Sequence, residues 1–127
     1  MLKNYLFMPF MACILALSFA APLLAASMNA EVFYVKAVAL KKKGVGAILS
    51  KDMDILKGEM NNVRTNLRAE NEKAKKTGKP LYCPPKNSSM SSDQLISELS
   101  AAGQTKRKQM TMHAFMRDYM VRKYPCK

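Results

Sequence analysis

Apolar side chains recur every three or four residues in the central part of the chain. Between Lys51 and Lys76 this spacing places them on one face of an amphipathic helix. Ser50 offers an N-cap, and Gly78 with Pro80 ends the pattern. We therefore predict one long helix over 51–76. Its apolar stripe consists of Met53, Leu56, Met60, Val63, Leu67 and Ala74, and its polar face includes Asn62, Arg64, Arg68, Glu72 and Lys75.

A second apolar segment, AEVFYVKAVALKKK at residues 30–43, precedes the long helix. Glu31 at its start and three lysines at its end complement the two ends of a helix, and Gly44 suits a C-terminal cap. This predicts a largely buried helix over 30–43. The lysines are interpreted first as a solvated helix end and second as an anion-binding patch. The GVGAIL that follows lacks a dinucleotide-binding pattern and is interpreted as a connector.

The last third of the chain carries two further helix starts. Ser91 and Gln94 have the spacing of a capping box, which predicts a helix over 92–102. Thr111 is the N-cap of a last helix that reaches about Lys123, before Pro125. The apolar face of this last helix consists of Met112, Phe115, Met116, Tyr119 and Met120.

These patterns predict an all-α protein with about four helices in one small domain. The second helix is the longest. The segment KTGKPLYCPPKNSSMSS, rich in helix-breaking residues, is interpreted as a loop between the second and third helices.

The first 26 residues have the composition of a secretory signal peptide. One positive charge, Lys3, precedes an apolar run that ends in small residues. We expect cleavage close to Ala26 or Ser27, which leaves a single domain over 27–127 in the periplasm of a Gram-negative bacterium or outside the cell. Two alternatives are an uncleaved anchor, since about 20 apolar residues can span a bilayer, and a lipoprotein signal that uses Cys13.

Beyond the leader the chain is strongly basic. The sequence has 21 Lys and Arg against 9 Asp and Glu, and only Lys3 lies in the leader, which leaves a net charge of +11. In a secreted protein this excess favours anionic head groups, peptidoglycan carboxylates or acidic proteins, or it serves solubility alone. We expect no nucleic-acid partner, and membrane contact only through the signal sequence. The candidate contact residues are Lys106, Arg107, Lys108, Arg117, Arg122 and Lys123.

Two cysteines remain once the leader is removed, Cys83 and Cys126. An even pair in an oxidising compartment predicts one structural disulfide. Closing a loop of about 44 residues would remove roughly 4 kcal/mol of unfolded-state entropy. The alternative is a redox pair, but the segment around Cys83 has no Cys-x-x-Cys spacing.

Residues that could carry catalysis or bind a metal are few. His113 is the only histidine, and Met112 and Met116 could join it as Cu(I) ligands. Because these methionines share a helix face with Phe115, a core role is the first interpretation, and an adaptable partner surface is a further alternative. The chain lacks the common hydrolase, zinc-protease and P-loop motifs. We expect no enzyme, no cofactor and no metal site.

Four short segments together resemble a known family: FYVKAVALKKKGVGAILSKD, YCPP, SSDQLISEL and the terminal RKYPCK. This combination is similar to the Tai-type family, the periplasmic immunity proteins of type VI secretion amidase effectors. The resemblance implies an all-α fold, a disulfide that joins Cys83 to Cys126, often a homodimer, and inhibition of a cell-wall amidase by covering its active site.

Our leading hypothesis is thus a non-enzymatic secreted binding protein, an immunity-type inhibitor of a periplasmic cell-wall amidase. One alternative is a periplasmic chaperone that resembles the HdeA type, since acid would raise the positive charge and expose methionine-rich faces. Binding of Cu(I) is the third hypothesis.

Overall fold

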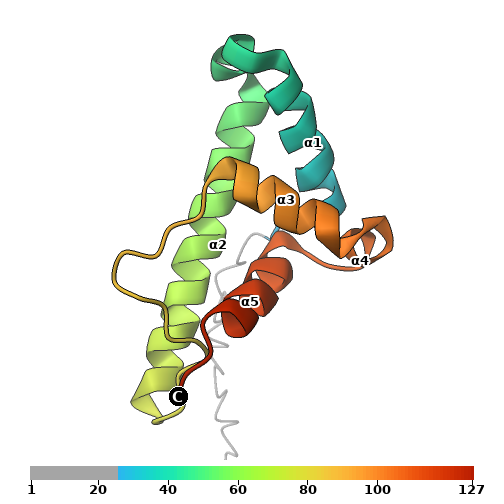
Figure 1. The fold of residues 1–127 in the computed structure, drawn as a ribbon. Coiled ribbons are helices and arrows are strands. Elements are labelled where there is room, and N and C mark those ends of the chain that lie inside the picture. The colour runs from blue at the N-terminus through green and yellow to red at the C-terminus, as the bar shows by residue number, and fades with distance from the viewer. Residues whose placement is uncertain (1–25) are drawn as a thin grey trace, which may run out of the picture.

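The computed structural model describes residues 26–127, which form helices joined by turns and one long loop (Figure 1). No strand occurs in this part of the chain, and an isolated bridge pairs Asn29 with Thr111. The predicted all-α fold is therefore confirmed. Residues 1–25 of the predicted leader, Cys13 among them, lie outside the described residues. The helices are α1 (Ala30–Lys43), the 3-10 helix η1 (Gly44–Leu49), α2 (Lys51–Lys76), α3 (Ser92–Ala102), α4 (Gln104–Lys108) and α5 (Met112–Lys123).

Capping groups explain why the predicted helices begin where they do. Asn29 accepts hydrogen bonds from the first backbone N–H groups of α1, and Thr111 accepts one from Ala114 at the start of α5. Ser91 and Gln94 form the predicted capping box of α3. Ser50 occupies the N-cap position of α2, but its side chain makes no capping hydrogen bond there. The predicted connector is the short η1.

Helix α2 is the longest helix of the domain (Figure 1). α1 and α5 both contact α2, while α3 and α4 contact α1. The core lies between these elements, and Leu99, Met112 and Phe115 are among its most buried side chains. The apolar stripes predicted for α2 and α5 supply much of this core, since Leu56, Val63 and Leu67 are buried as well.

The chain before α1 is tied to α5 by backbone hydrogen bonds. The Ala30 N–H donates to the Met110 carbonyl at 2.9 Å, and the Met112 N–H donates to the Met28 carbonyl at 2.7 Å. The Ser27 hydroxyl donates to the Glu59 carboxylate of α2 and accepts from the His113 N–H. Residues 27–31, residues 110–113 and the ion pair of Glu31 with Arg107 form what we call the N-terminal junction.

Helix α4 was not predicted, and Arg107 within it is buried. The Arg107 guanidinium lies 2.5 Å from the Glu31 carboxylate, donates to the Leu99 carbonyl at 2.7 Å and stacks 3.9 Å from the centre of the Tyr34 ring. The five polar residues of α4, QTKRK, carry no helical apolar pattern, so the sequence does not predict this short helix.

The loop over 77–91 leaves the end of α2 and returns to α3 (Figure 1). The predicted disulfide between Cys83 and Cys126 is present, with Cα atoms 5.0 Å apart. Asn71 of α2 holds the loop from the other side, because its amide accepts from Leu81 N–H at 2.8 Å and donates to the Tyr82 carbonyl at 3.0 Å. The loop is thus fixed at two points.

Candidate functional site: a groove along α2

An open groove runs along one face of α2. It has a volume of about 1180 Å³, and α1, α3, α5 and the loop over 77–91 supply its other walls. A groove of this size exceeds the roughly 300–1,000 Å³ of small-molecule sites, so its dimensions suit an extended or helical segment of another protein. We call this feature the α2 groove.

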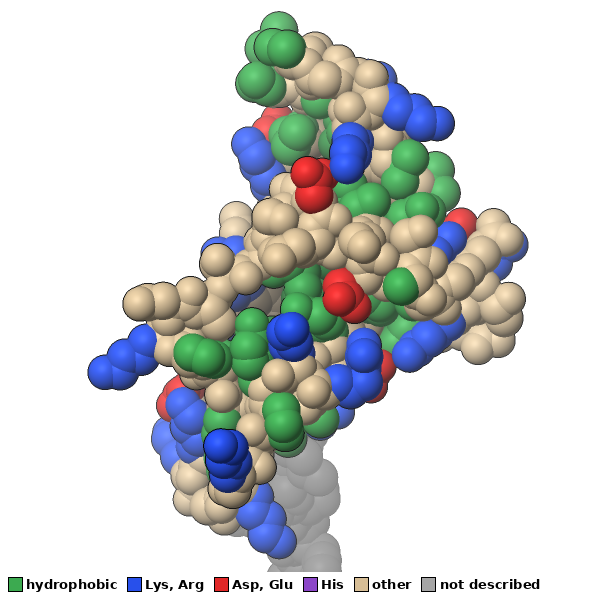
Figure 2. All heavy atoms as spheres, viewed as in Figure 1, with side chains coloured by type: hydrophobic (Ala, Val, Ile, Leu, Met, Phe, Trp, Pro, Cys, Tyr) green, Lys and Arg blue, Asp and Glu red, His purple; other side chains and the backbone are tan. Residues whose placement is uncertain are grey.

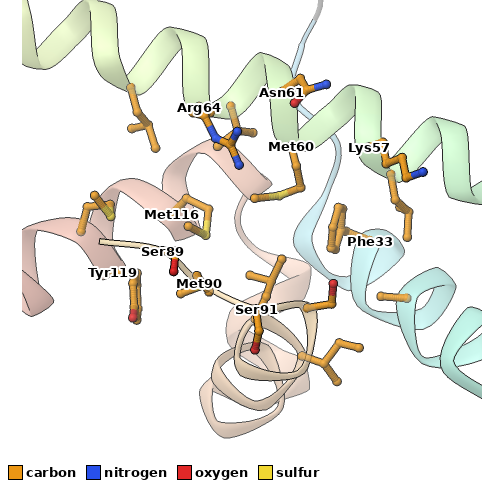
Figure 3. Close-up of a pocket in the computed structure, with 18 of the residues that line it drawn as sticks. Phe33, Lys57, Met60, Asn61, Arg64, Ser89, Met90, Ser91, Met116 and Tyr119 are labelled. Atoms are coloured by element: carbon orange, nitrogen blue, oxygen red, sulfur yellow. The ribbon is translucent and has the colours of Figure 1, made fainter. Parts of the chain in front are cut away.

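The floor of the α2 groove is apolar and rich in methionine. Met60 of α2, Met116 of α5 and Phe33 of α1 surround the same space (Figure 3). Met116 and Phe33 are buried, whereas the other methionines of the lining are half-buried. Methionine side chains are flexible and polarisable, so such a floor adapts to partners of different shape. The half-buried methionines are Met53, Met60, Met90 and Met120.

One edge of the α2 groove carries unpaired positive charge. Lys57, Arg64 and Arg68 follow one another along α2 at spacings of seven and four residues, and all three are exposed. None of them makes an ion pair with a residue that the structure describes. By contrast, Lys75 at the end of the same edge bonds Glu72 at 2.7 Å. This edge therefore attracts anionic groups.

The opposite edge is lined by hydroxyl groups. The end of the loop and the start of α3 contribute serines that lie across from Asn61 and Arg64 (Figure 3). Asp93 in the first turn of α3 pairs with Lys41 at 2.8 Å and is thereby partly neutralised. Hydroxyl groups can donate or accept hydrogen bonds, so this edge is suited to a backbone or polar side chains. The serines are Ser88, Ser89, Ser91 and Ser92.

Three titratable side chains of the groove have shifted pKa values. A hydrogen bond from Lys75 lowers the pKa of Glu72. Burial raises the pKa of both Tyr82 and Tyr119, so these phenols stay neutral well above physiological pH. Tyr82 and Tyr119 therefore add no negative charge to the groove, and Glu72 remains charged next to its lysine.

The predicted contact residues on α4 and α5 are largely engaged with acids. Lys106 lies 3.2 Å from Asp118, and Arg122 lies 3.5 Å from the same carboxylate. Arg117 lies 3.4 Å from Glu70. Lys106 and Arg117 also line a shallow hollow of about 400 Å³.

The remaining three predicted contact residues are not brought together. Lys108 and Lys123 are exposed and make no ion pair with residues 26–127. Arg107 is only 6% exposed, so placing it on a contact face was wrong. This burial could not be predicted from the sequence, because Arg107 is one of three consecutive cations.

The residues weighed as copper ligands lie in different surroundings. Met112 and Met116 are buried in the core, in agreement with the first interpretation of that helix face. His113 points to Glu70, with its Nε2 atom 2.8 Å from the carboxylate but without hydrogen-bond alignment. Within residues 26–127, no three His, Cys, Asp or Glu side chains are grouped so that they could hold a metal ion.

Sequence reasoning missed two features of the site. Asn71 continues the spacing of the α2 stripe four residues after Leu67, and a polar residue at such a position is the signal that could have indicated its role. The path of the loop over 77–91, which leaves the groove open, has no comparable signal. No helix in the described part of the chain is long and apolar enough to span a membrane.

Comparisons of the chain with protein-family models, curated proteins and solved structures found no match.

Proposed function

We propose that this protein is a binding protein and that the α2 groove holds an acidic, partly apolar segment of a partner protein. The observation that carries the proposal is the combination of a methionine-lined floor with three unpaired cations on one edge. Monomeric proteins rarely leave a large apolar surface uncovered without a role in recognition. A flexible apolar floor provides contact area, and the charged edge provides orientation.

The charges favour the α2 groove over the basic face of α4 and α5. Around the α4–α5 hollow, Asp118 and Glu70 already neutralise three of the cations. Lys57, Arg64 and Arg68 can form new ion pairs without breaking old ones. A partner that carries Asp or Glu beside Leu, Phe or Met would satisfy both parts of the groove.

The specific partner that we propose is a periplasmic cell-wall amidase, which the protein would inhibit in the manner of an immunity protein. The support is the resemblance of four short segments of the sequence to the Tai-type family, together with a small disulfide-stabilised domain suited to an oxidising compartment. The protein has no catalytic part in this proposal, because inhibition requires only that the complex covers the enzyme's active site.

The test is an inhibition assay with the mature, oxidised protein and purified cell-wall amidases. We expect one amidase to lose its peptidoglycan hydrolysis at an equimolar ratio. The double variant Arg64→Glu with Arg68→Glu should weaken inhibition about 100-fold, since reversing two contacting charges costs several kcal/mol of affinity. Full inhibition by this variant would exclude the groove, and a complete lack of inhibition of all amidases by the wild type would exclude the amidase.

A matched control is available on the same helix. Lys73 and Lys76 are exposed cations of α2 that do not line the groove. Lys73→Glu with Lys76→Glu changes the net charge by the same amount as the groove variant. Unchanged inhibition by this control would show that the position of the charges matters, not their number.

A second candidate function, an acid-activated chaperone, is favoured by the ion pairs that hold α1. Lys36 bonds Asp52 of α2 at 2.6 Å, and this hydrogen bond lowers the pKa of Asp52. The hydrogen bond from Arg107 likewise lowers the pKa of Glu31. Protonation of both carboxylates would release α1 from α2 and α4, and the apolar floor would become more exposed.

The chaperone function is tested by client aggregation at about pH 2 to 3, below the usual carboxylate pKa values of roughly 4. Suppression of aggregation there but not at neutral pH would support it. Equal aggregation with and without the protein would exclude it. Asp52→Asn, which removes the acid-sensitive pair, should shift the onset of the activity toward neutral pH.

A further inference from the structure

The end of the molecule formed by η1 exposes three aliphatic side chains. Leu49 is 94% exposed, Val45 is 84% exposed and Ile48 is 69% exposed. Figure 2 shows hydrophobic side chains at this end of the molecule, with Lys or Arg side chains beside them. The turn is nevertheless well anchored, because Ala47 between them is 4% exposed and packs in the core. We call Val45, Ile48 and Leu49 the apolar tip.

Three lysines surround the apolar tip in the sequence. Lys42 and Lys43 end α1, and Lys51 begins α2. All three are exposed, and none makes an ion pair with a residue of the described chain. Of the acids in the first turn of α2, Asp52 is already paired with Lys36, and Asp54 is exposed. The charge available at this end is therefore positive.

We propose that the apolar tip docks on an anionic lipid surface. Aliphatic side chains on a projecting turn can enter the boundary between head groups and acyl chains. The lysines are long enough to keep their ammonium groups at the level of the phosphates while their stems lie on apolar surface. The sequence alone predicted membrane contact only through the leader, and the tip adds a second contact that uses the folded domain.

The composition of the tip favours a lipid surface over a protein partner. Residues 42–51 contain no aromatic residue and no arginine, which are the residue types that anchor most protein interfaces. Lysine, as a flexible point charge, suits a diffuse layer of phosphates, whereas bidentate recognition uses arginine. The tip is also convex, while the α2 groove provides the concave surface. Membrane docking thus goes beyond the proposed function and does not depend on it.

Co-sedimentation with vesicles tests the proposal. The mature protein should bind vesicles of equimolar phosphatidylglycerol and phosphatidylcholine, and should bind pure phosphatidylcholine far more weakly. Ile48→Ser with Leu49→Ser should lower the partition coefficient by about tenfold or more. Lys42→Gln with Lys43→Gln should lower it by about 25-fold, since each lysine near an anionic surface is worth about fivefold.

The control removes two lysines from the opposite end of α2. Lys73→Gln with Lys76→Gln lowers the net charge equally, about 40 Å from the tip at 1.5 Å per residue. We expect this variant to bind vesicles within about threefold of the wild type, since its charges lie beyond several Debye lengths. Equal losses in both lysine variants would overturn the proposal, because attraction would then depend on net charge alone. A wild type that does not bind anionic vesicles would also overturn it.

Fluorescence gives a direct reading of insertion, because the chain contains no tryptophan. Leu49→Trp should show a blue-shifted emission when anionic vesicles are added. Val121→Trp, on a side chain of α5 that is 38% exposed, should show no such shift. An unshifted spectrum for Leu49→Trp in sedimented protein would overturn the proposal. So would a loss of amidase binding, with vesicle binding intact, in Ile48→Ser with Leu49→Ser, since the tip would then be a protein contact.

Discussion

The N-terminal junction and the α2 groove differ in whether their arginines have ionic partners within the protein. In the junction, the buried Arg107 guanidinium contacts the Glu31 carboxylate, the Leu99 carbonyl and the Tyr34 ring, so its charge has partners inside the protein. In the groove, Arg64 and Arg68 lie beside an apolar floor without an ionic partner among the described residues. A buried cation costs stability when it is unpaired, whereas an exposed one does not.

We therefore expect the junction to determine the stability of the domain and the cationic edge of the groove to determine binding. Changes in the junction should unfold the domain and alter binding only through unfolding. Changes on the cationic edge should leave the fold intact and alter binding directly. The fixed loop over 77–91 lies between the two cases, because its anchors stabilise the domain and also shape one wall of the groove.

The largest expected effect comes from the disulfide. Replacing Cys83 and Cys126 by serine should lower the free energy of unfolding by about 4 kcal/mol. Without the disulfide, the unfolded chain gains the conformational entropy that closing a loop over 43 residues had removed. Urea unfolding with and without reductant measures this loss. A wild type whose urea midpoint does not change on reduction would show that the loop is held by its other contacts.

The junction is tested by Arg107→Ala. This substitution should lower the free energy of unfolding by about 3 kcal/mol, because charge-assisted hydrogen bonds and packing are lost. The control is Lys106→Ala, which changes the exposed neighbour of Arg107. Its free energy of unfolding should stay within about 0.5 kcal/mol of the wild-type value. Chemical denaturation of both variants provides the comparison. Similar midpoints for the two would mean that the junction stabilises no more than a surface pair.

The second anchor of the loop is tested by Asn71→Ala, which should lower the free energy of unfolding by about 2 kcal/mol. The Leu81 N–H and the Tyr82 N–H and carbonyl would lose their partner while Tyr82 stays buried. Hydrogen exchange should become faster at the amides of Leu81 and Tyr82, and amides of α3 serve as the internal reference. Unchanged exchange at these two amides would contradict an anchoring role for Asn71.

The smallest expected effect is the pH dependence of the junction. The pKa of Glu31 is lowered from its ordinary 4.5, chiefly by the hydrogen bond from Arg107. A lowered carboxyl pKa contributes stability that is complete above about 4.5 and is lost as the pH falls through the folded-state value. Glu31→Gln should therefore show a smaller decrease in Tm between neutral pH and about pH 3 than the wild type. Parallel decreases in both proteins would contradict this assignment.

Local sequence patterns predicted most of the fold. The starts of α3 and α5 follow from the predicted caps Ser91 and Thr111, whereas the start of α1 was predicted from Glu31 and its cap in the structure is Asn29. Helix α4 has no such pattern, since its single buried side chain is a charged one whose partner, Glu31, lies 76 residues away. Periodicity shows which face of a helix is apolar, but not whether that face will be covered.

The candidate site was less predictable, because periodicity does not show which apolar residues of a helix a neighbouring segment will cover. The stripe of α2 was predicted as one apolar face of an amphipathic helix. Leu56, Val63 and Leu67 of this face are core residues, whereas Met53 and Met60 are half-buried in the groove. Whether a neighbour covers them depends on the path of the loop, which Asn71 and Cys83 fix from a distance.

The most direct test of the separation between stability and binding compares two properties of the double variant Arg64→Glu with Arg68→Glu: its affinity for the amidase that we propose as partner, and its Tm. Our account predicts a Tm within a few degrees of the wild type, because exposed substitutions cost little, together with an affinity about 100-fold weaker. Wild-type affinity in this variant would contradict the account, since binding would then take place away from the cationic edge of the α2 groove.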